Sequence, residues 1–183
     1  MRTSALAVSA IVILLGSAGH AQTKEPAVSK AGSWMTYRLT HPLHEIEATS
    51  KDVEYHLGVD AAERQVRSVS AVVDVTTFNS GNSNRDSHAM EVIDAIDYPE
   101  ASFESSSVVH AGDSLKVAGT LTFHGVTHDI VMTAHQRWTD DTLEVRGQFE
   151  LSLTAFKIER PSLLMIPVED ALRFTFAAVF LLK

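Results

Sequence analysis

Apolar and polar residues alternate with a period of two along most of the chain after Trp34. Successive side chains of a β-strand point to opposite faces of a sheet, so this pattern predicts strands with one buried face. Short turn sequences separate the alternating segments, which predicts an antiparallel meander. The clearest segments are 53–59, 69–75, 101–107, 117–123, 130–134, 145–153 and 172–178.

An open sheet of this length would leave two unpaired edges, and closure into a barrel removes them. We therefore expect an all-β, antiparallel barrel of about eight strands. A strand as long as 117–123 spans roughly 23 Å at ~3.3 Å per residue, which is enough for an elongated interior. A barrel of this size either fills with its own side chains or holds one slender ligand.

One segment breaks the period of two. Ser83 or Asn84 can cap a helix whose first turn carries Asp86, a residue that complements the positive end of the helix dipole. We therefore expect one short helix inserted between strands and limited by Pro99. Its apolar residues recur at helical spacing and are Ala89, Met90, Ile93 and Ile96.

The first residues have the features of a secretory signal peptide. Arg2 precedes an apolar run that is shorter than the roughly 20 residues of a membrane-spanning helix, and small residues lead to Ala21. We expect residues 1–21 to be removed and the protein to be periplasmic or secreted; an uncleaved anchor is the alternative. Residues 22–32 lack periodicity and predict a flexible linker before one domain at 33–183.

The chain has no cysteine and a formal net charge of −8. Without cysteine, thiol redox chemistry is excluded and the fold depends on its core. Lysine and arginine are few and scattered, which argues against nucleic acid as a partner.

The densest group of ionisable residues contains Arg85, Asp86 and His88. These residues could supply a base and an orienting carboxylate. A role at the rim of the barrel is the plainer interpretation, because Asp86 suits a first helical turn and Arg85 and His88 share a helix face. No G-x-S-x-G elbow is present. We expect no enzyme activity, with a hydrolase or isomerase as the alternative.

Two histidine pairs, His41 with His44 and His124 with His128, raise the question of a metal site. Each pair lies at a strand end around Pro or Gly, and neither has a third ligand at a recognisable zinc spacing. We expect histidines at surface turns, no specific metal site and no cofactor.

An apolar stripe follows one face of the predicted strands and forms either ordinary core or the wall of a ligand cavity. Gly119, Ala134, Gly147 and Ala178 interrupt the stripe, and small inward residues favour open space along a barrel axis. The stripe comprises Val117, Leu121, Phe123, Ile130, Met132, Phe149, Leu151, Phe174 and Phe176.

Three separated motifs resemble those of the YceI-like, lipid/polyisoprenoid-binding family, and the resemblance extends from Ser33 to the C-terminus. Residues 82–88 are similar to its T-G-N-x-x-R-D-x-H segment, 97–105 to its y-P-x-i-x-F-x-S strand, and 119–127 to its G-x-L-t-l-H-G-v-T hairpin. The first strands depart from the family pattern, since 37–44 only loosely matches it.

The resemblance implies a lipocalin-like barrel that binds a long isoprenoid chain, often with a quinone or similar head, in the periplasm. It implies a non-catalytic binding protein, with Arg85 and His88 at the mouth and Asp86 beside them. The implied wall comprises Phe103, Leu121, Phe123, Ile130, Met132, Phe149, Leu151, Phe174 and Phe176. An accessory role for a membrane electron-transfer partner is an alternative, and a transient membrane contact and a homodimer stay open.

Overall fold

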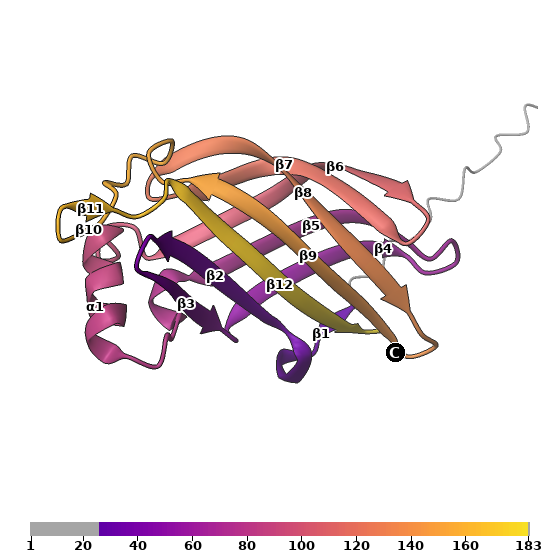
Figure 1. The fold of residues 1–183 in the computed structure, drawn as a ribbon. Coiled ribbons are helices and arrows are strands. Elements are labelled where there is room, and N and C mark those ends of the chain that lie inside the picture. The colour runs from indigo at the N-terminus through magenta and orange to yellow at the C-terminus, as the bar shows by residue number, and fades with distance from the viewer. Residues whose placement is uncertain (1–25, 183) are drawn as a thin grey trace, which may run out of the picture.

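The computed structural model describes residues 26–182, which form one curled antiparallel sheet with an α-helix across one end (Figure 1). The helix is α1 (Ser83–Val92), and two short 3₁₀ helices are η1 (Lys30–Gly32) and η2 (Val75–Thr77). The strands of the sheet are β1 (Ala27–Val28), β2 (Trp34–His41), β3 (His44–Ser50), β4 (Val53–Asp60), β5 (Gln65–Asp74), β6 (Glu100–Ala111), β7 (Ser114–Phe123), β8 (Val126–Trp138), β9 (Thr142–Ser152) and β12 (Ala171–Leu181). A separate hairpin consists of β10 (Ser162–Leu163) and β11 (Ile166–Pro167).

The strands follow the order β3-β2-β12-β9-β8-β7-β6-β5-β4, and β1 pairs with β12 beside this path. The prediction of an all-β, antiparallel, lipocalin-like fold with one inserted helix is confirmed. The sheet contains ten strands, whereas about eight were expected. Within residues 26–182, no helix is both long enough and apolar enough to cross a bilayer.

The expectation that the sheet closes on itself is wrong for the described part of the chain. β3 and β4 are the two ends of the strand order, and no ladder joins them in residues 26–182. The free edge of β3 is partnered at one point, because Thr49 exchanges two backbone hydrogen bonds with Asn79, at 3.0 and 3.1 Å. The segment leading to α1 therefore takes the place that β4 would occupy in a closed barrel.

The folded domain begins before Ser33. β2 covers only residues 172–177 of β12, and β1 pairs with the remaining edge at 180–181. The backbone N–H of Ser29 also donates to the carbonyl of Val179 (2.7 Å). Within the predicted linker, Ala27–Val28 is therefore a strand of the sheet, and Lys30–Gly32 forms the 3₁₀ helix η1. The predicted signal peptide and residues 22–25 lie outside the described residues.

Helix α1 starts and ends earlier than predicted. Its cap is Asn82, whose side-chain oxygen accepts hydrogen bonds from the backbone N–H groups of Asn84 and Arg85, both at 3.1 Å. The helix ends at Val92 because Asp94 adopts a φ of 48°, which an α-helix does not continue through. Ile96, expected within the helix among the apolar residues at helical spacing, lies beyond its end and is 97% exposed.

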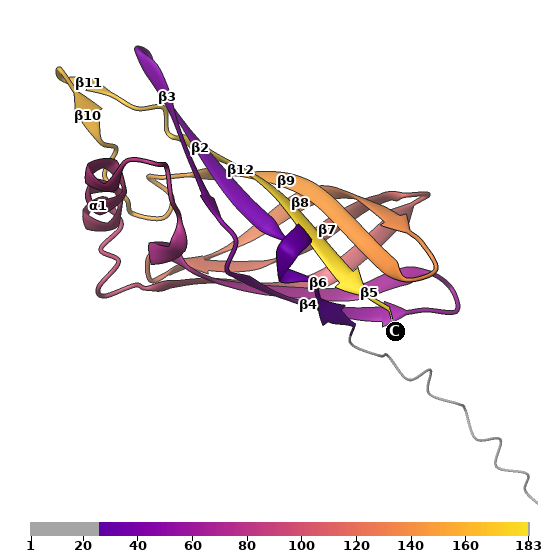
Figure 2. The same ribbon diagram turned by 90° about the horizontal axis from the view of Figure 1, so that it is seen from below.

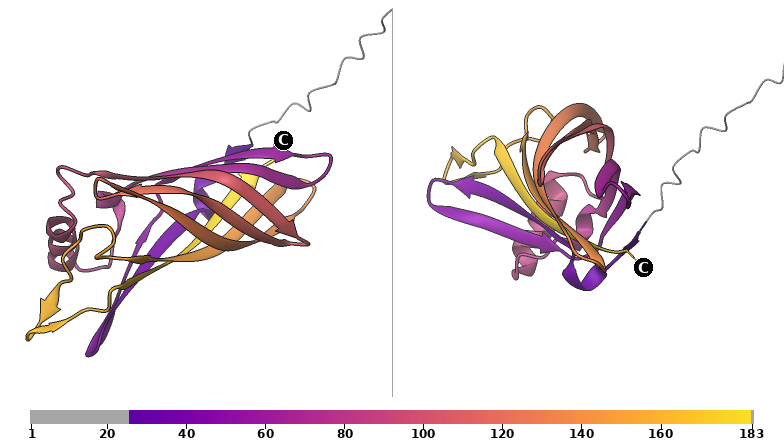
Figure 3. Two further views of the ribbon diagram at one scale, coloured as in Figure 1. Left: turned by 90° about the horizontal axis from the view of Figure 1, so that it is seen from above. Right: turned by 90° about the vertical axis from the view of Figure 1, so that its right-hand side faces the viewer.

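Figures 2 and 3 show how the elements are placed at the two ends of the sheet. Helix α1, the β10–β11 hairpin and the tip of the β2–β3 hairpin lie at one end. The C-terminal end of β12 and the turn between β4 and β5 lie at the other. The interior of the sheet is thus covered by α1 at one end, and the connection from β9 to β12 folds over the same end.

Asp170 holds the two ends of that connection together. Its carboxylate accepts hydrogen bonds from the Ser152 hydroxyl (2.5 Å) and from the backbone N–H and hydroxyl of Thr154 (2.9 and 3.1 Å). The bonds from Ser152 and then from Thr154 lower the pKa of Asp170 below its ordinary value. A hydrogen-bonded carboxylate is stabilised in its charged form, so these bonds favour the folded state only while Asp170 is ionised.

An Asp170→Asn variant is expected to lose about 1 kcal/mol of stability at neutral pH, a value discounted for partial exposure. The lowered folded-state pKa means that the contribution of Asp170 is fully present above the unfolded carboxyl pKa of about 4 and disappears as the pH falls below it. The difference in unfolding free energy between wild type and variant should therefore shrink on acidification, as urea titrations at several pH values can measure. Asp140→Asn, which removes the same charge from an exposed carboxylate, is the control. A difference in unfolding free energy between wild type and Asp170→Asn that grows on acidification would contradict the prediction.

Candidate functional site

The concave face of the sheet encloses an apolar cavity of about 210 Å³. It reaches from Arg85 on α1 to Phe180 near the opposite end of β12. A single water needs about 10–15 Å³ of such space, so the cavity has room for on the order of fifteen groups of that size. The stripe of inward residues is therefore both core and cavity wall, and it leaves a slender lumen.

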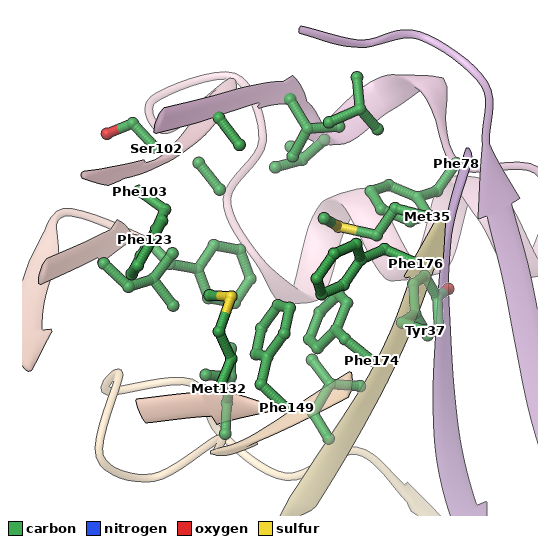
Figure 4. Close-up of a pocket in the computed structure, with 18 of the residues that line it drawn as sticks. Met35, Tyr37, Phe78, Ser102, Phe103, Phe123, Met132, Phe149, Phe174 and Phe176 are labelled. Carbon is green, nitrogen blue, oxygen red and sulfur yellow. The ribbon is translucent and has the colours of Figure 1, made fainter. Parts of the chain in front are cut away.

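Aromatic rings and methionine side chains gather around this lumen (Figure 4). Phe149 and Phe174 are stacked with their ring centroids 4.8 Å apart and nearly parallel. Tyr37 lies edge-on to Phe174 at 6.4 Å and is 5.3 Å from Phe78, which precedes α1. Rings from β2, β9 and β12 thus form one continuous apolar surface near the helix end.

The structure brings all of the predicted binding residues to the border of this one cavity, although their contact with a ligand stays a prediction. They come from α1, β6, β7, β8, β9 and β12. The residues are Arg85, Asp86, His88, Phe103, Leu121, Phe123, Ile130, Met132, Phe149, Leu151, Phe174 and Phe176.

The first strands also contribute to the wall, which was not predicted from the sequence. Met35, Tyr37 and Leu39 of β2 and Tyr55 of β4 also border the cavity. The alternation of these residues with polar neighbours was a usable signal. Residues 37–44 match the family pattern only loosely, so the resemblance indicated no binding role there.

Gly119 and Gly147 do not leave open space, contrary to expectation. A Cβ atom on Gly119 would lie 2.6 Å from the ring of Phe103, and one on Gly147 would lie 2.5 Å from the ring of Phe176. The two rings therefore cover the backbone of the glycines. Ala134 and Ala178, by contrast, do border the lumen.

A small polar group lies at the helix end of the lumen. Asp86 accepts a hydrogen bond from the backbone N–H of Ser80 (3.0 Å), which fixes its carboxylate beside the start of α1. Burial raises the pKa of Tyr37, the negative charge of Asp86 adds to the shift, and Arg85 opposes it. Tyr37 therefore keeps its phenolic proton at neutral pH. The half-buried Arg85 borders the cavity and presents a cation at the end of an apolar tube.

Asp86 and His88 have different partners. The side chain of His88 is 67% exposed and its Nδ1 lies 3.6 Å from the carboxylate of Glu91, whereas Asp86 is bonded to Ser80. A base oriented by a carboxylate requires a direct hydrogen bond between the two groups. The described contacts thus give Asp86 a loop-fixing role and pair His88 with Glu91, although both residues border the cavity.

His41 is buried and the side chain of His124 is only 10% exposed, which corrects the expectation of surface histidines for these two residues. His41 is 2% exposed, and its Nε2 donates to the carbonyl of Ile166 (3.0 Å). His124 Nδ1 donates to the carbonyl of Phe156 (2.9 Å), and its Nε2 lies 3.3 Å from Asp94. Both rings are covered by the long connection after β9, which has no periodicity that would have indicated its position. Among residues 26–182, no three metal-ligating side chains form a group that could hold a metal ion.

Two of the sequence motifs pack against each other outside the lumen. The ring of Tyr98 lies edge-on to His124, with centroids 4.9 Å apart. Gly125 has a φ of +67°, and a Cβ atom at this position would lie 2.5 Å from the Tyr98 ring. The positive φ of the β7–β8 turn favours glycine at this position, and any larger residue would also clash with the Tyr98 ring.

A family model described as "YceI-like domain" matches residues 26–180. A UPF0312 protein from Pseudomonas savastanoi pv. phaseolicola is 28% identical over 173 residues, which cover 88% of this chain and 90% of that protein. Protein YceI from Escherichia coli O157:H7 is 28% identical over 126 residues, 66% of each chain.

Solved structures resemble the fold closely. BcnA from Burkholderia cenocepacia matches 83% of this chain and 98% of its own, with a TM-score of 0.75 and 22% identity. A polyisoprenoid binding domain from Saccharophagus degradans matches 86% and 97% of the two chains, with a TM-score of 0.65 and 13% identity. At these identities, the structural likeness establishes the fold alone.

Proposed function

The chain belongs to the YceI-like family, and from this membership we propose that it is a non-catalytic binding protein for a long apolar lipid of the isoprenoid or quinone type. The observation that carries the proposal is the slender, apolar lumen that runs from α1 to the far end of β12. The polyisoprenoid-binding domain among the structural neighbours has the same fold and supports this ligand class.

Burial of the chain supplies most of the binding free energy. Each buried CH₂ group contributes about 0.8 kcal/mol, so about ten of them contribute ~8 kcal/mol before the cost of association. A hydrogen bond to a head group contributes only about 1 kcal/mol net. We therefore expect the width and length of the chain to dominate selection, with weak discrimination among chains of similar width.

The polar group at the helix end suits a head group that accepts hydrogen bonds. The guanidinium of Arg85 and the phenol of Tyr37 are both donors, and the oxygens of a quinone or a similar head accept such bonds. The head would lie beside α1 and the tail would extend along the lumen. This orientation places the polar atoms where the cavity is least apolar.

Release of a bound compound tests the function. Protein purified without detergent is expected to release a long apolar compound on organic extraction, detected by mass spectrometry, and to show the matching mass before extraction. Protein with an empty lumen that also fails to bind an added fluorescent isoprenoid would overturn the proposal. Copurification with membranes in the absence of any lipid would instead favour an accessory role.

An Arg85→Met variant is expected to bind a quinone-headed chain up to about tenfold more weakly than wild type does, because it loses a charged donor but keeps a side chain of similar length. A hydrocarbon of the same length without a head should bind equally to both proteins. Displacement of a fluorescent lipid measures both affinities. Arg64→Met serves as the control, since it removes the same charge from the β4–β5 turn, away from the cavity border. Equal losses for both ligands would assign Arg85 to positioning α1 and not to head-group binding.

We also propose that the protein is exported and cleaved after Ala21, on the basis of the apolar run and small residues at the N-terminus. N-terminal sequencing of the mature protein should begin at Gln22. A mature chain that begins at Met1 in the cytoplasm would be incompatible with this localisation.

A further inference from the structure

The turn of the β10–β11 hairpin exposes four consecutive apolar residues, Leu163 to Ile166. Met165 is 95% exposed and Leu164 is 75% exposed. No charged residue occurs between Arg160 and Glu169. A contiguous, uncharged, protruding set of large apolar side chains is typical of an interaction site on a protein surface.

The backbone conformation of this turn is one that large apolar residues rarely adopt. Leu164 and Met165 form the two-residue turn, with φ values of 53° and 66°. Two-residue hairpin turns with positive φ at both positions favour Asn-Gly, because larger side chains are disfavoured in this conformation. Leucine and methionine therefore occupy positions where a turn with only a structural role would carry other residues, which points to a function for their side chains.

The hairpin lies at the mouth of the lumen. Pro161, which immediately precedes β10, borders the cavity. The bond from His41 to the carbonyl of Ile166 ties the hairpin to β2. The adjoining β2–β3 turn exposes a further apolar side chain, Leu43, to 61%. Figures 2 and 3 show the two hairpins projecting in the same direction beyond α1.

We propose that the apolar tip, defined as residues 163–166 together with Leu43, inserts into the surface of a neutral lipid bilayer and brings the cavity mouth against it. The apolar tip projects from the surface and carries no charge, so it can enter the apolar part of a bilayer without burying a charged group. The same end of the molecule carries Glu91, Asp94, Asp97 and Glu100 in and after α1, which disfavours an anionic surface. The biological meaning of this docking rests on the proposed lipid-binding function, but docking itself is measurable without a ligand.

The test is flotation of the full mature protein with phosphatidylcholine vesicles. A Leu164→Asn/Met165→Gly variant is expected to bind the vesicles at least about tenfold more weakly. Asn-Gly suits the existing turn, so the variant should unfold at the same temperature as wild type or a higher one. The matched control is Val109→Ser/Val131→Ser, which removes two exposed apolar residues from the outer faces of β6 and β8 and should leave flotation unchanged.

Direct insertion of the tip is measurable because the chain contains no cysteine. Met165→Cys, labelled with a polarity-sensitive fluorophore, should report an apolar environment on addition of phosphatidylcholine vesicles and a smaller response when phosphatidylglycerol is mixed in. Wild type that does not float, a tip variant that floats as well as wild type, or tighter binding to the anionic vesicles would each overturn the proposal. Loading of an isoprenoid added in ethanol, without vesicles, should be equal in wild type and the tip variant, so failure of docking and failure of lipid binding are distinguishable.

Discussion

A Val145→Phe variant is expected to fold but to bind the lipid on the order of 100-fold more weakly than wild type. Val145 points inward from β9 and borders the lumen, and it is 8% exposed. Its partner across the β9–β12 ladder is Ala178, another small residue that borders the cavity. A phenyl ring at this position would occupy space that three or four CH₂ groups of the ligand would otherwise fill, which corresponds to ~2–3 kcal/mol.

The measurement is displacement of a fluorescent isoprenoid, with the unfolding temperature from circular dichroism as the check on folding. Overpacking a filled core usually destabilises by about 1–3 kcal/mol, and open space beside Val145 should keep the cost at the lower end. Val131→Phe, on the exposed face of β8, is the control and should not change binding. Unchanged affinity in Val145→Phe would mean that the ligand does not reach β9.

A Gly147→Ala variant is expected to lose about 2–4 kcal/mol of stability, or roughly 5–15 °C in unfolding temperature. The added Cβ would lie 2.5 Å from the ring of Phe176 and 2.8 Å from the carbonyl oxygen of Thr133. The Phe176 ring packs at a tilt against Phe149 in the aromatic wall, and the carbonyl belongs to β8, the strand that pairs with β9. Neither can move away without disturbing the packing or the ladder.

Gly81→Ala separates the effect of contact from the effect of backbone conformation. Gly81 has a φ of +78°, but a Cβ atom there would meet nothing within 4 Å. The Gly81→Ala substitution should lower the free energy of unfolding by only about 1–2 kcal/mol, the usual penalty for a non-glycine residue in a left-handed conformation. Addition of Phe176→Leu to Gly147→Ala should restore part of the stability, since it removes the ring that the new methyl group meets. Equal unfolding temperatures for Gly147→Ala and Gly81→Ala would show that the ring and the carbonyl adjust freely.

The period of two was sufficient to predict most of the strands and the side of each strand that faces inward. Phe149 and Phe174 were placed on the wall because alternation alone decides the face on which a side chain lies. The β1 strand was not predicted because Ala27–Val28 is too short for periodicity to be visible. Its place is determined by the edge of β12 that β2 leaves unpaired.

Features that depend on register or on irregular segments could not be predicted. Gly119 was correctly placed on an inward face, but the ring that covers it belongs to Phe103, on the neighbouring strand. His41 and His124 lie at turns as expected, yet both are largely covered by the connection after β9, to which each donates a hydrogen bond. Local sequence patterns contain no information on such pairings between distant segments.

Because no ladder joins β3 to β4 in residues 26–182, strand number and stagger alone do not set the width of the lumen. A barrel closed by a full ladder has its diameter fixed by strand number and stagger. Here the boundary is joined by the backbone bonds between Thr49 and Asn79 and by side-chain bonds such as Ser50 to Thr77 (2.6 Å) and Tyr55 to the carbonyl of Trp34 (3.2 Å). Widening the lumen at this boundary would break these few bonds and no β-ladder between β3 and β4.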